Sequence, residues 1–195
     1  MLLSPAPAEP SAWVKRFASL IPAGGTVLDL ACGNGRHVQW LAGQGLQVTG
    51  VDRDEAAVRA LGSTSEIIVA DIEAGPWPLP QRCFDAVVVT NYLWRPLLPT
   101  IQASLAPGGV LIYETFADGQ QHIGKPSRPD FLLQPGELLR AFAGLRVVAF
   151  EDGHEAVRER FVQRLVAVQV ANPAAAGATP SNPAPTRYSL AGSTR

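Results

Sequence analysis

Short apolar runs recur along the chain, and the segments between them have the apolar spacing of amphipathic helices or the residues typical of turns. Runs rich in β-branched and aromatic residues predict strands at residues 26–30, 47–51, 66–70, 84–90, 110–115, 145–150 and 161–170. Strands that alternate with helical segments are typical of a parallel sheet with helices on both faces. The pattern therefore predicts an α/β fold with a doubly wound, mostly parallel seven-stranded sheet.

An amphipathic helix is predicted before the first strand, at residues 11–20. Its apolar stripe contains Trp13, Phe17 and Leu20, and proline and glycine residues follow it. Residues 1–25 therefore form a helical lead-in, which we expect to lie against the sheet edge or over a bound ligand.

The second half of the chain departs from simple alternation. Residues 116–134 show no clear helix or strand and are rich in glycine and proline, so we expect either a lid above the ligand face or a rigid surface loop. Residues 135–144 begin with proline and end with glycine, which predicts a helix. Residues 152–160 then predict the turn of a closing antiparallel hairpin. Alanine, proline, serine and threonine dominate residues 172–195, which predicts a disordered tail and leaves 26–171 as the folded domain.

A strand, a glycine loop and a helix follow one another early in the chain. Asp29 lies within the strand, Gly33 and Gly35 form the loop, and the helix is predicted at residues 36–42. Glycines let the backbone approach a ligand, and a helix N-terminus offers it unpaired N–H groups. Val38 stands where the nicotinamide fingerprint has its third glycine, so the loop predicts a nucleotide-like ligand other than NAD.

The segment from Asp29 to Gly35 resembles motif I of the class I methyltransferases that use S-adenosylmethionine, whose core reads acid-x-glycine-x-glycine-x-glycine. Later family motifs match in order, at residues 51–52, 70–72, 84–89 and 105–109. Ala31 stands where the family often has its first glycine, and we expect it to keep a negative φ. The resemblance implies a Rossmann-like fold whose last strand is antiparallel, and S-adenosylmethionine as the cofactor.

The same resemblance implies a role for each cofactor-binding residue. Asp52 would accept the ribose hydroxyls, and Asp71 with the Ile72 N–H would bind adenine. Gly33 and its neighbours would meet the methionine amino group, and Asn91 the same end of the ligand. From the residues alone, an N-cap role for Asp52 and a turn role for Asp71 stay open. The implied cofactor-binding set is Asp29, Ala31, Cys32, Gly33, Asn34, Gly35, Arg36, Asp52, Arg53, Asp71, Ile72 and Asn91.

The second half of the chain is similar to the tellurite-resistance methyltransferases, which are small enzymes that methylate chalcogen oxyanions and soft nucleophiles. The similar segments are residues 131–139, 147–152 and 158–166. The segment after the fourth strand lacks an Asn-Pro-Pro-Tyr motif, which favours a small-molecule acceptor over a nucleic acid or protein. The acceptor candidates are Tyr92 and Trp94 as pocket walls or core residues, His122 for acid–base work, and Arg128, Arg158 and Arg160 as anion-binding or structural arginines. No catalytic residue is assigned, because in-line displacement from a sulfonium needs mainly positioning.

Composition narrows the functional classes. The chain has 195 residues, 47% hydrophobic and 17% charged, with a formal net charge of −1. This describes one globular domain, makes nucleic acid an unlikely partner and gives no sign of a membrane segment. The two cysteines, Cys32 and Cys83, lack metal-ligand spacing, so we expect no metal site, reduced thiols and a cytoplasmic protein. An RNA or protein methyltransferase and a non-catalytic cofactor-binding protein stay open as alternatives.

Overall fold

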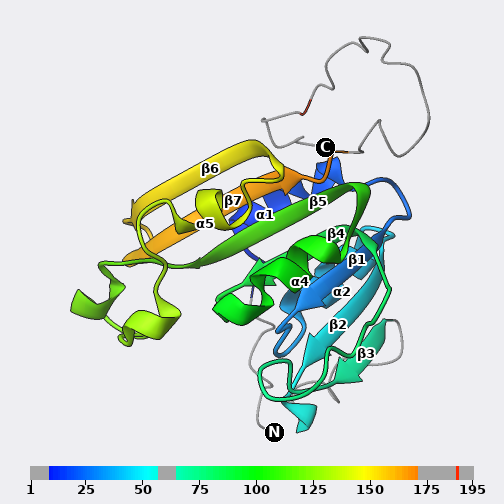
Figure 1. The fold of residues 1–195 in the computed structure, drawn as a ribbon, viewed down its shortest axis with the longest axis horizontal. Helices are drawn as coiled ribbons and strands as arrows, with labels where there is room; N and C mark the ends of the chain where they lie inside the picture. Colours follow the sequence, from blue (N-terminus) through cyan, green and yellow to red (C-terminus); the bar gives the residue numbers. More distant parts are fainter. Residues whose placement is uncertain (1–8, 57–64, 171–187, 189–195) are drawn as a thin grey trace, which may run out of the picture.

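The computed structural model describes residues 9–56, 65–170 and 188. Within this part of the chain, seven strands form one sheet in the order β3-β2-β1-β4-β5-β7-β6 (Figure 1). The strands are β1 (Thr26–Leu30), β2 (Gln47–Asp52), β3 (Glu66–Val69), β4 (Phe84–Thr90), β5 (Leu105–Phe116), β6 (Arg146–Glu155) and β7 (Arg160–Val168). β1 to β5 pair in parallel, and β7 runs antiparallel between β5 and β6. The predicted doubly wound sheet with an antiparallel last strand is confirmed.

Two strands are longer, by four residues or more, than the sequence pattern predicted. β5 begins at Leu105 instead of residue 110. β6 continues through Glu155, so the turn predicted at residues 152–160 is confined to 156–159. The prediction was wrong because it read Asp152 and the following glycine as turn formers, whereas the ladder continues through them and pairs Asp152 with Gln163 of β7.

Helices cover both faces of the sheet. α1 (Ala12–Phe17), the 3₁₀ turn η1 (Ala18–Leu20) and α2 (Arg36–Gly43) belong to one face, and α4 (Leu98–Ala103) and α5 (Glu137–Ala141) to the other (Figure 1). Short 3₁₀ turns are η2 (Arg95–Leu97), η3 (Gln120–His122) and η4 (Pro129–Phe131). The single helix predicted at residues 11–20 is thus an α-helix followed by a 3₁₀ turn. Ser11 caps it by accepting a hydrogen bond from the Trp13 N–H.

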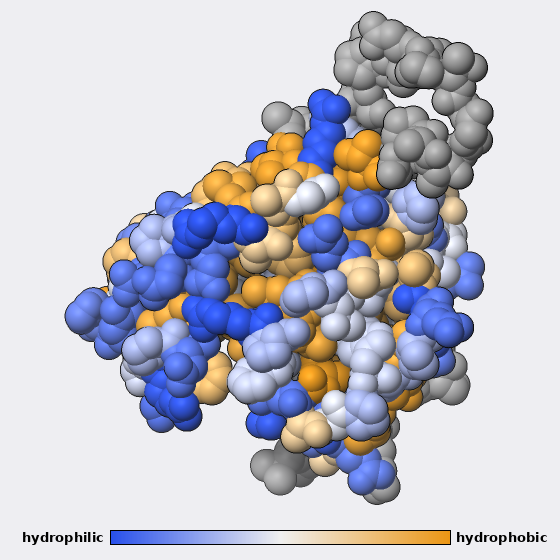
Figure 2. All heavy atoms as spheres, in the orientation of Figure 1, coloured by the Kyte–Doolittle hydropathy of each residue, from blue (hydrophilic) through white to orange (hydrophobic). Residues whose placement is uncertain are grey.

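Each face of the sheet has its own apolar core. Val14 and Phe17 of α1 pack with Val38 and Leu41 of α2 on one face, so the leading helix buries an apolar side but lies on a face of the sheet and not at its edge. On the other face, the core includes Leu98 and Ile101 from α4 and Leu138 from α5. On the surface view of Figure 2, hydrophobic side chains reach solvent over the edge strand β6. Within the described residues, no helix is long and apolar enough to cross a membrane.

The segment at residues 116–134, in which no helix or strand was predicted, has defined local structure. It contains η3 and η4, and a parallel bridge between Ala117 and Leu133 closes its base. The Asp118 N–H donates to the Leu133 carbonyl at 2.9 Å, and the Leu133 N–H donates to the Phe116 carbonyl at 3.0 Å. The two ends of the segment are therefore held together beside the end of β5. Whether it acts as a lid stays a prediction.

Most of the tail predicted at residues 172–195 lies outside the described residues. Tyr188 is described, and it packs half-buried against the core on the α1 side. The Arg146 guanidinium stands over its ring, 5.6 Å from the centroid. This one tail residue therefore contacts the domain, which the composition of the tail did not predict.

Candidate cofactor and acceptor site

The loop between β1 and α2 is held against the end of β2 by two backbone donors. The Cys32 N–H donates to the Val51 carbonyl at 3.1 Å, and the Gly33 N–H donates to Asp52 Oδ2 at 2.7 Å. Ala31 has φ +54°, so the expectation of a negative φ was wrong. The backbone turns sharply at this point to leave the strand, and it takes the left-handed conformation although a β-carbon is present.

A glycine in β2 makes room for this loop. A β-carbon at Gly50 would come within 3.0 Å of Cys32 Sγ and 3.1 Å of a Val38 methyl group. The Cys32 side chain is buried there, and burial raises the pKa of its thiol to about 12. Cys32 is therefore a small packing residue at neutral pH and not a reactive thiolate.

A hollow of about 190 Å³ opens at the carboxyl ends of β1, β2 and β3. We call it the first hollow, and its lining residues are Ala31, Asp52, Arg53, Ala70, Asp71, Ile72, Glu73 and Tyr92. Five of these belong to the predicted cofactor set. Their positions follow from the fold, because the ends of adjacent parallel strands meet at one edge of the sheet.

The two carboxylates of the first hollow also organise the backbone around them. Asp52 Oδ1 accepts the Asp54 N–H at 2.9 Å. Asp71 Oδ1 accepts the N–H groups of Glu73 and Ala74 at 2.9 and 3.0 Å, and these donors lower the pKa of Asp71. The turn role left open for Asp71 is thus present in the structure, and its role toward adenine stays a prediction.

Beneath the loop, Asp29 and His37 form a buried pair of titratable groups. Neither carboxylate oxygen of Asp29 has a hydrogen-bond partner among the described residues, and His37 Nδ1 lies 4.0 Å from Oδ2. His37 Nε2 accepts the Ser11 N–H at 3.0 Å, so the ring proton is assigned to Nδ1. Burial raises the pKa of Asp29 to about 7 and lowers the pKa of His37 to about 4. His37 is therefore neutral at physiological pH.

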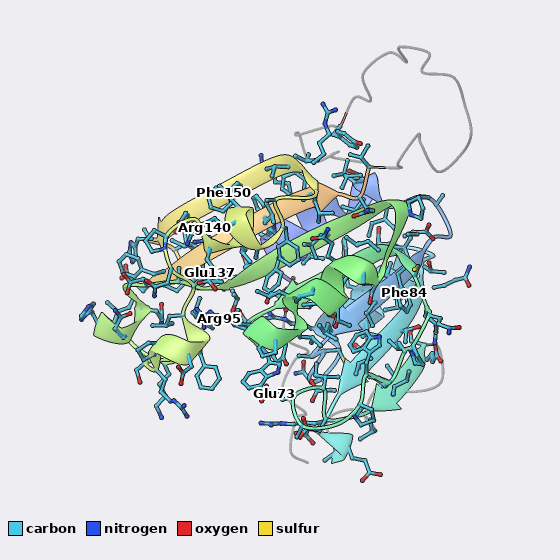
Figure 3. The ribbon with its side chains drawn as sticks, viewed as in Figure 1. Glu73, Phe84, Arg95, Glu137, Arg140 and Phe150 are labelled. Atoms are coloured by element: carbon cyan, nitrogen blue, oxygen red, sulfur yellow. The ribbon has the colours of Figure 1, made fainter. Side chains whose placement is uncertain are left out.

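A second hollow of about 260 Å³ adjoins the first one, and Glu73 and Tyr92 line both. Its lining residues are Glu73, Asn91, Tyr92, Leu93, Thr115, Phe116, Pro126 and Phe131. Glu73 lies in the loop after β3 (Figure 3). The buried Tyr113 hydroxyl donates to the Tyr92 carbonyl at 2.9 Å, which fixes the backbone at the boundary between the two hollows. Tyr92 thus lines both hollows and also packs against the core on the α4 side, so both positions that the sequence left open are present, and its role toward an acceptor stays a prediction.

The other acceptor candidates do not line either hollow. Trp94 packs against the core on the α4 side, and His122 is exposed in η3. Arg128 is exposed and pairs with Asp130 at 2.7 Å. Arg158 is exposed on the turn between β6 and β7.

Arg160 belongs to a buried charge cluster beside β5. It pairs with Glu155 and lies 3.2 Å from the buried Glu114 carboxylate, which also binds Arg164 at 2.5 Å. Arg36, at the start of α2, lies near the same carboxylate, and burial lowers its pKa. These contacts support a structural role for Arg160 and not an anion-binding one.

Sequence reasoning missed an ion pair that holds the segment at residues 116–134. Arg95 of η2 donates to both carboxylate oxygens of Glu137, at 2.7 and 3.0 Å, and the two side chains point toward each other in Figure 3. It also donates to the carbonyls of Asp130 and Leu132. We call this set of contacts the Arg95 clasp. The partners are 35 to 42 positions away, so no local pattern marks them.

Comparison with known proteins agrees with this geometry. A family model described as a methyltransferase domain matches residues 27–109. The tRNA U34 carboxymethyltransferase of Haemophilus ducreyi is 32% identical over an alignment of 102 residues that covers 46% of this chain and 32% of that protein. The chain thus spans about a third of the length of this relative.

Two solved structures show the same fold. A SAM-dependent methyltransferase from Methanosarcina mazei superposes with a TM-score of 0.66 at 16% identity, covering 85% of this chain and all of that one. TehB from Haemophilus influenzae superposes with a TM-score of 0.63 at 19% identity, covering 78% of this chain and 60% of that one. At these identities the likeness concerns the fold. The resemblance to the class I methyltransferases is confirmed, and S-adenosylmethionine is the cofactor that it implies.

The residues present fit this cofactor. Asp52 and Asp71 offer acceptors to the hydroxyl and amino donors of a nucleoside, and Ala70 and Ile72 offer apolar surface to a base. The buried Asp29 carboxylate lies beneath the glycine loop, where a cationic amino group would stabilise its charged form.

Proposed function

Since residues 27–109 match a family model described as a methyltransferase domain, we propose that this chain is an S-adenosylmethionine-dependent methyltransferase that transfers a methyl group to a small-molecule acceptor by direct in-line displacement. When bound, the cofactor supplies an electrophilic methyl group on a sulfonium sulfur. The protein has to hold the acceptor in line with the breaking bond and to exclude water.

One observation carries this proposal: the second hollow adjoins the first one at Tyr92 and Glu73. The first hollow contains the carboxylates for the nucleoside, and the second contains mostly apolar and aromatic side chains. A cofactor in the first hollow would thus have a pocket for an acceptor beside it. A pocket of about 260 Å³ suits a small molecule.

Within the proposal, Asp52 binds the ribose hydroxyls, and Asp71 with the Ile72 N–H binds adenine. Arg53 lines the adenosine end of the same hollow. The glycine loop receives the methionine moiety, with Gly33, Asn34 and Gly35 presenting their backbone and Arg36 beginning the next helix. Asn91, which lines the second hollow, faces the reacting end.

Calorimetric titration tests cofactor binding. We expect S-adenosylmethionine and S-adenosylhomocysteine to bind more tightly than NAD. Asp52→Ala should weaken their binding by about 1.5–3 kcal/mol, the usual contribution of hydrogen bonds to a charged group. Asp130→Ala, which removes an exposed carboxylate outside the first hollow, is the matched control and should leave affinity unchanged. Tighter binding of NAD would overturn the proposal.

A tRNA acceptor is the second candidate, because the Haemophilus ducreyi relative is named a tRNA carboxymethyltransferase. An aromatic hollow also suits a base turned out of its stack. Turnover assays that detect S-adenosylhomocysteine decide between the candidates when total tRNA and a panel of small acceptors are compared. Cofactor binding without turnover on either would indicate the non-catalytic alternative. We further propose a cytoplasmic location, where the unpaired thiols of Cys32 and Cys83 would stay reduced.

A further inference from the structure

Three aromatic side chains from separate elements line the second hollow. Tyr92 follows β4, Phe116 ends β5 and Phe131 ends η4. Aromatic faces attract cations and the polarised C–H groups beside a cationic nitrogen. The hollow therefore has walls suited to an ammonium group or to a nitrogen that becomes one.

The charge in this hollow is negative. Glu73 is its charged lining residue, and no lysine or arginine lines it within the described part of the chain. Burial, followed by the nearby Glu73 carboxylate, raises the pKa of Tyr92, so its hydroxyl stays neutral. The one guanidinium at the adjoining first hollow, that of Arg53, stands beside two more carboxylates, Asp52 and Asp71.

Three arginines were suggested by the sequence for an anionic acceptor, and none of them lines the second hollow: Arg128, Arg158 and Arg160. Arg128 stands over the Phe131 ring, 5.2 Å from its centroid, and its charge is balanced by Asp130. Arg160 is buried against Glu114. An oxyanion in the second hollow would thus meet the Glu73 carboxylate without a lining cation, and like charges at close range repel.

We propose that the acceptor is a small aliphatic amine, held in the second hollow by Glu73 and the aromatic walls. This substrate class rests on the proposed function, since it assumes methyl transfer from a cofactor in the first hollow. Glu73 would accept a hydrogen bond from an amine N–H, and the rings would surround the carbon atoms attached to nitrogen.

The methyl transfer to a neutral amine needs no protein base, because no proton has to leave the amine during the reaction. The lone pair of the neutral amine attacks the methyl carbon and forms the N–C bond, while the C–S bond breaks and its electron pair returns to sulfur. The positive charge moves from sulfur to nitrogen, and the product leaves as an ammonium ion. Glu73 stabilises the charge that develops on nitrogen, and it is present before the reaction begins.

The test compares the wild-type protein with Glu73→Gln, which keeps the shape and removes the charge. Small aliphatic amines, thiols, carboxylates and selenite are screened for S-adenosylhomocysteine production, and binding of S-adenosylhomocysteine is titrated separately. We expect turnover with amines, a pH profile of kcat/KM that rises toward the pKa of the amine, and at least a tenfold lower kcat/KM in Glu73→Gln. The Kd for S-adenosylhomocysteine should change less than twofold. Glu159→Gln is the matched control, since Glu159 is exposed on the turn between β6 and β7 and lines neither hollow, and it should leave amine turnover unchanged.

Other outcomes separate this proposal from the proposed function. Turnover with selenite or thiols but not with amines would overturn the amine assignment and leave methyl transfer intact. An equal loss of cofactor affinity and amine turnover in Glu73→Gln would assign Glu73 to the cofactor and also overturn it. Binding of S-adenosylhomocysteine with no amine methylated would reject the amine while cofactor binding stands. Absence of both binding and turnover would reject the proposed function itself.

Discussion

Ala31 and Asn91 share an uncommon backbone conformation at the edge of the sheet where the two hollows open. Their φ angles are +54° and +55°, and they directly follow β1 and β4, which are neighbours in the sheet. The left-handed conformation costs an alanine roughly 1–2 kcal/mol, whereas asparagine adopts it more readily, so Ala31 keeps it where surrounding contacts impose it. Strained residues of this kind gather at functional sites, which agrees with the proposed position of the reacting groups.

The strain at Ala31 leads to a prediction. Ala31→Gly should keep or raise the free energy of unfolding, by up to about 1 kcal/mol, because relief of strain slightly exceeds the added entropy of the unfolded chain. Ala31→Val, with a β-branched side chain in the same conformation, should be clearly less stable. Urea unfolding measures both. A glycine variant less stable than wild type would show that the alanine methyl group contributes packing that outweighs its strain.

Asp29 and His37 give opposite contributions to the pH dependence of stability. The pKa of Asp29 is raised from 3.8 to about 7, so the folded state holds a proton that the unfolded chain releases, and stability falls as pH rises between these values. The pKa of His37 is lowered from 6.5 to about 4, so the unfolded chain holds the extra proton, and stability falls as pH falls between these values. In the wild type the two slopes largely offset each other.

Single substitutions should therefore reveal each slope. In Asp29→Asn, the free energy of unfolding should rise with pH from about 4.5 to about 6.5, by up to about 1.4 kcal/mol per unit. In His37→Gln, it should fall with pH over the same range. Urea unfolding at several pH values measures both. Profiles parallel to that of the wild type would mean that the two groups titrate at their ordinary pKa values in the folded state.

The sequence identified the residues whose place follows from the ends of strands. Asp52 and Asp71 come directly after predicted strands, so a parallel sheet brings them to one edge. Glu73 follows Asp71 by two positions. Its place between the two hollows could not be predicted, because the other residue shared by both hollows, Tyr92, follows a different strand, β4. The sequence suggested Arg160 as an anion ligand. One of its actual partners, the buried Glu114, is 46 positions away, so no local pattern in the sequence could have indicated this ion pair.

At the scale of elements, the Arg95 clasp joins three parts of the chain. It links η2, which follows β4, to α5 and to the segment that contains η4. That segment contributes Phe131 to the second hollow, so the clasp positions part of the wall of this hollow. The length and glycine content of this segment suggested a functional loop. The ion pair that holds it could be identified only from the folded structure.

Arg95→Ala should loosen this segment. We expect a loss of about 1–2 kcal/mol in the free energy of unfolding, because the Glu137 carboxylate and two carbonyls lose a charged donor. Hydrogen exchange should become faster at residues 118–131. Arg140→Ala is the matched control, since Arg140 donates to the single Pro135 carbonyl and is exposed (Figure 3). If both variants exchange at the wild-type rate in this segment, the clasp does not determine its stability.

Strand positions were predicted better than strand ends. Apolar runs such as β4 are buried on both faces of the sheet, so their apolar composition is enough to predict a strand. β6 is an edge strand whose second half is polar, and it extends because its backbone pairs with β7 as far as Glu155; Gln163 also donates to Asp152 Oδ2 across the two strands at 2.9 Å. Such pairing depends on the partner strand and cannot be seen in the β6 sequence by itself.

At the scale of the whole molecule, the described residue of the tail, Tyr188, contacts the domain at a place that belongs to neither hollow. Tyr188 packs against the core shared by α1 and α2, and Arg146 of the edge strand β6 lies over its ring. Neither residue lines the first or the second hollow. The Tyr188 contact therefore bears on stability and not on the proposed chemistry.

Removal of residues 171–195 should lower the free energy of unfolding by roughly 1 kcal/mol, the contribution of a partly buried aromatic ring with a cation over its face. Tyr188→Ala in the full chain should reproduce most of that loss, and affinity for S-adenosylhomocysteine should be unchanged in both. Thermal and urea unfolding measure stability, and calorimetry measures affinity. A truncation with wild-type stability would show that the Tyr188 contact contributes nothing. A truncation much more costly than Tyr188→Ala would show that other tail residues also stabilise the domain.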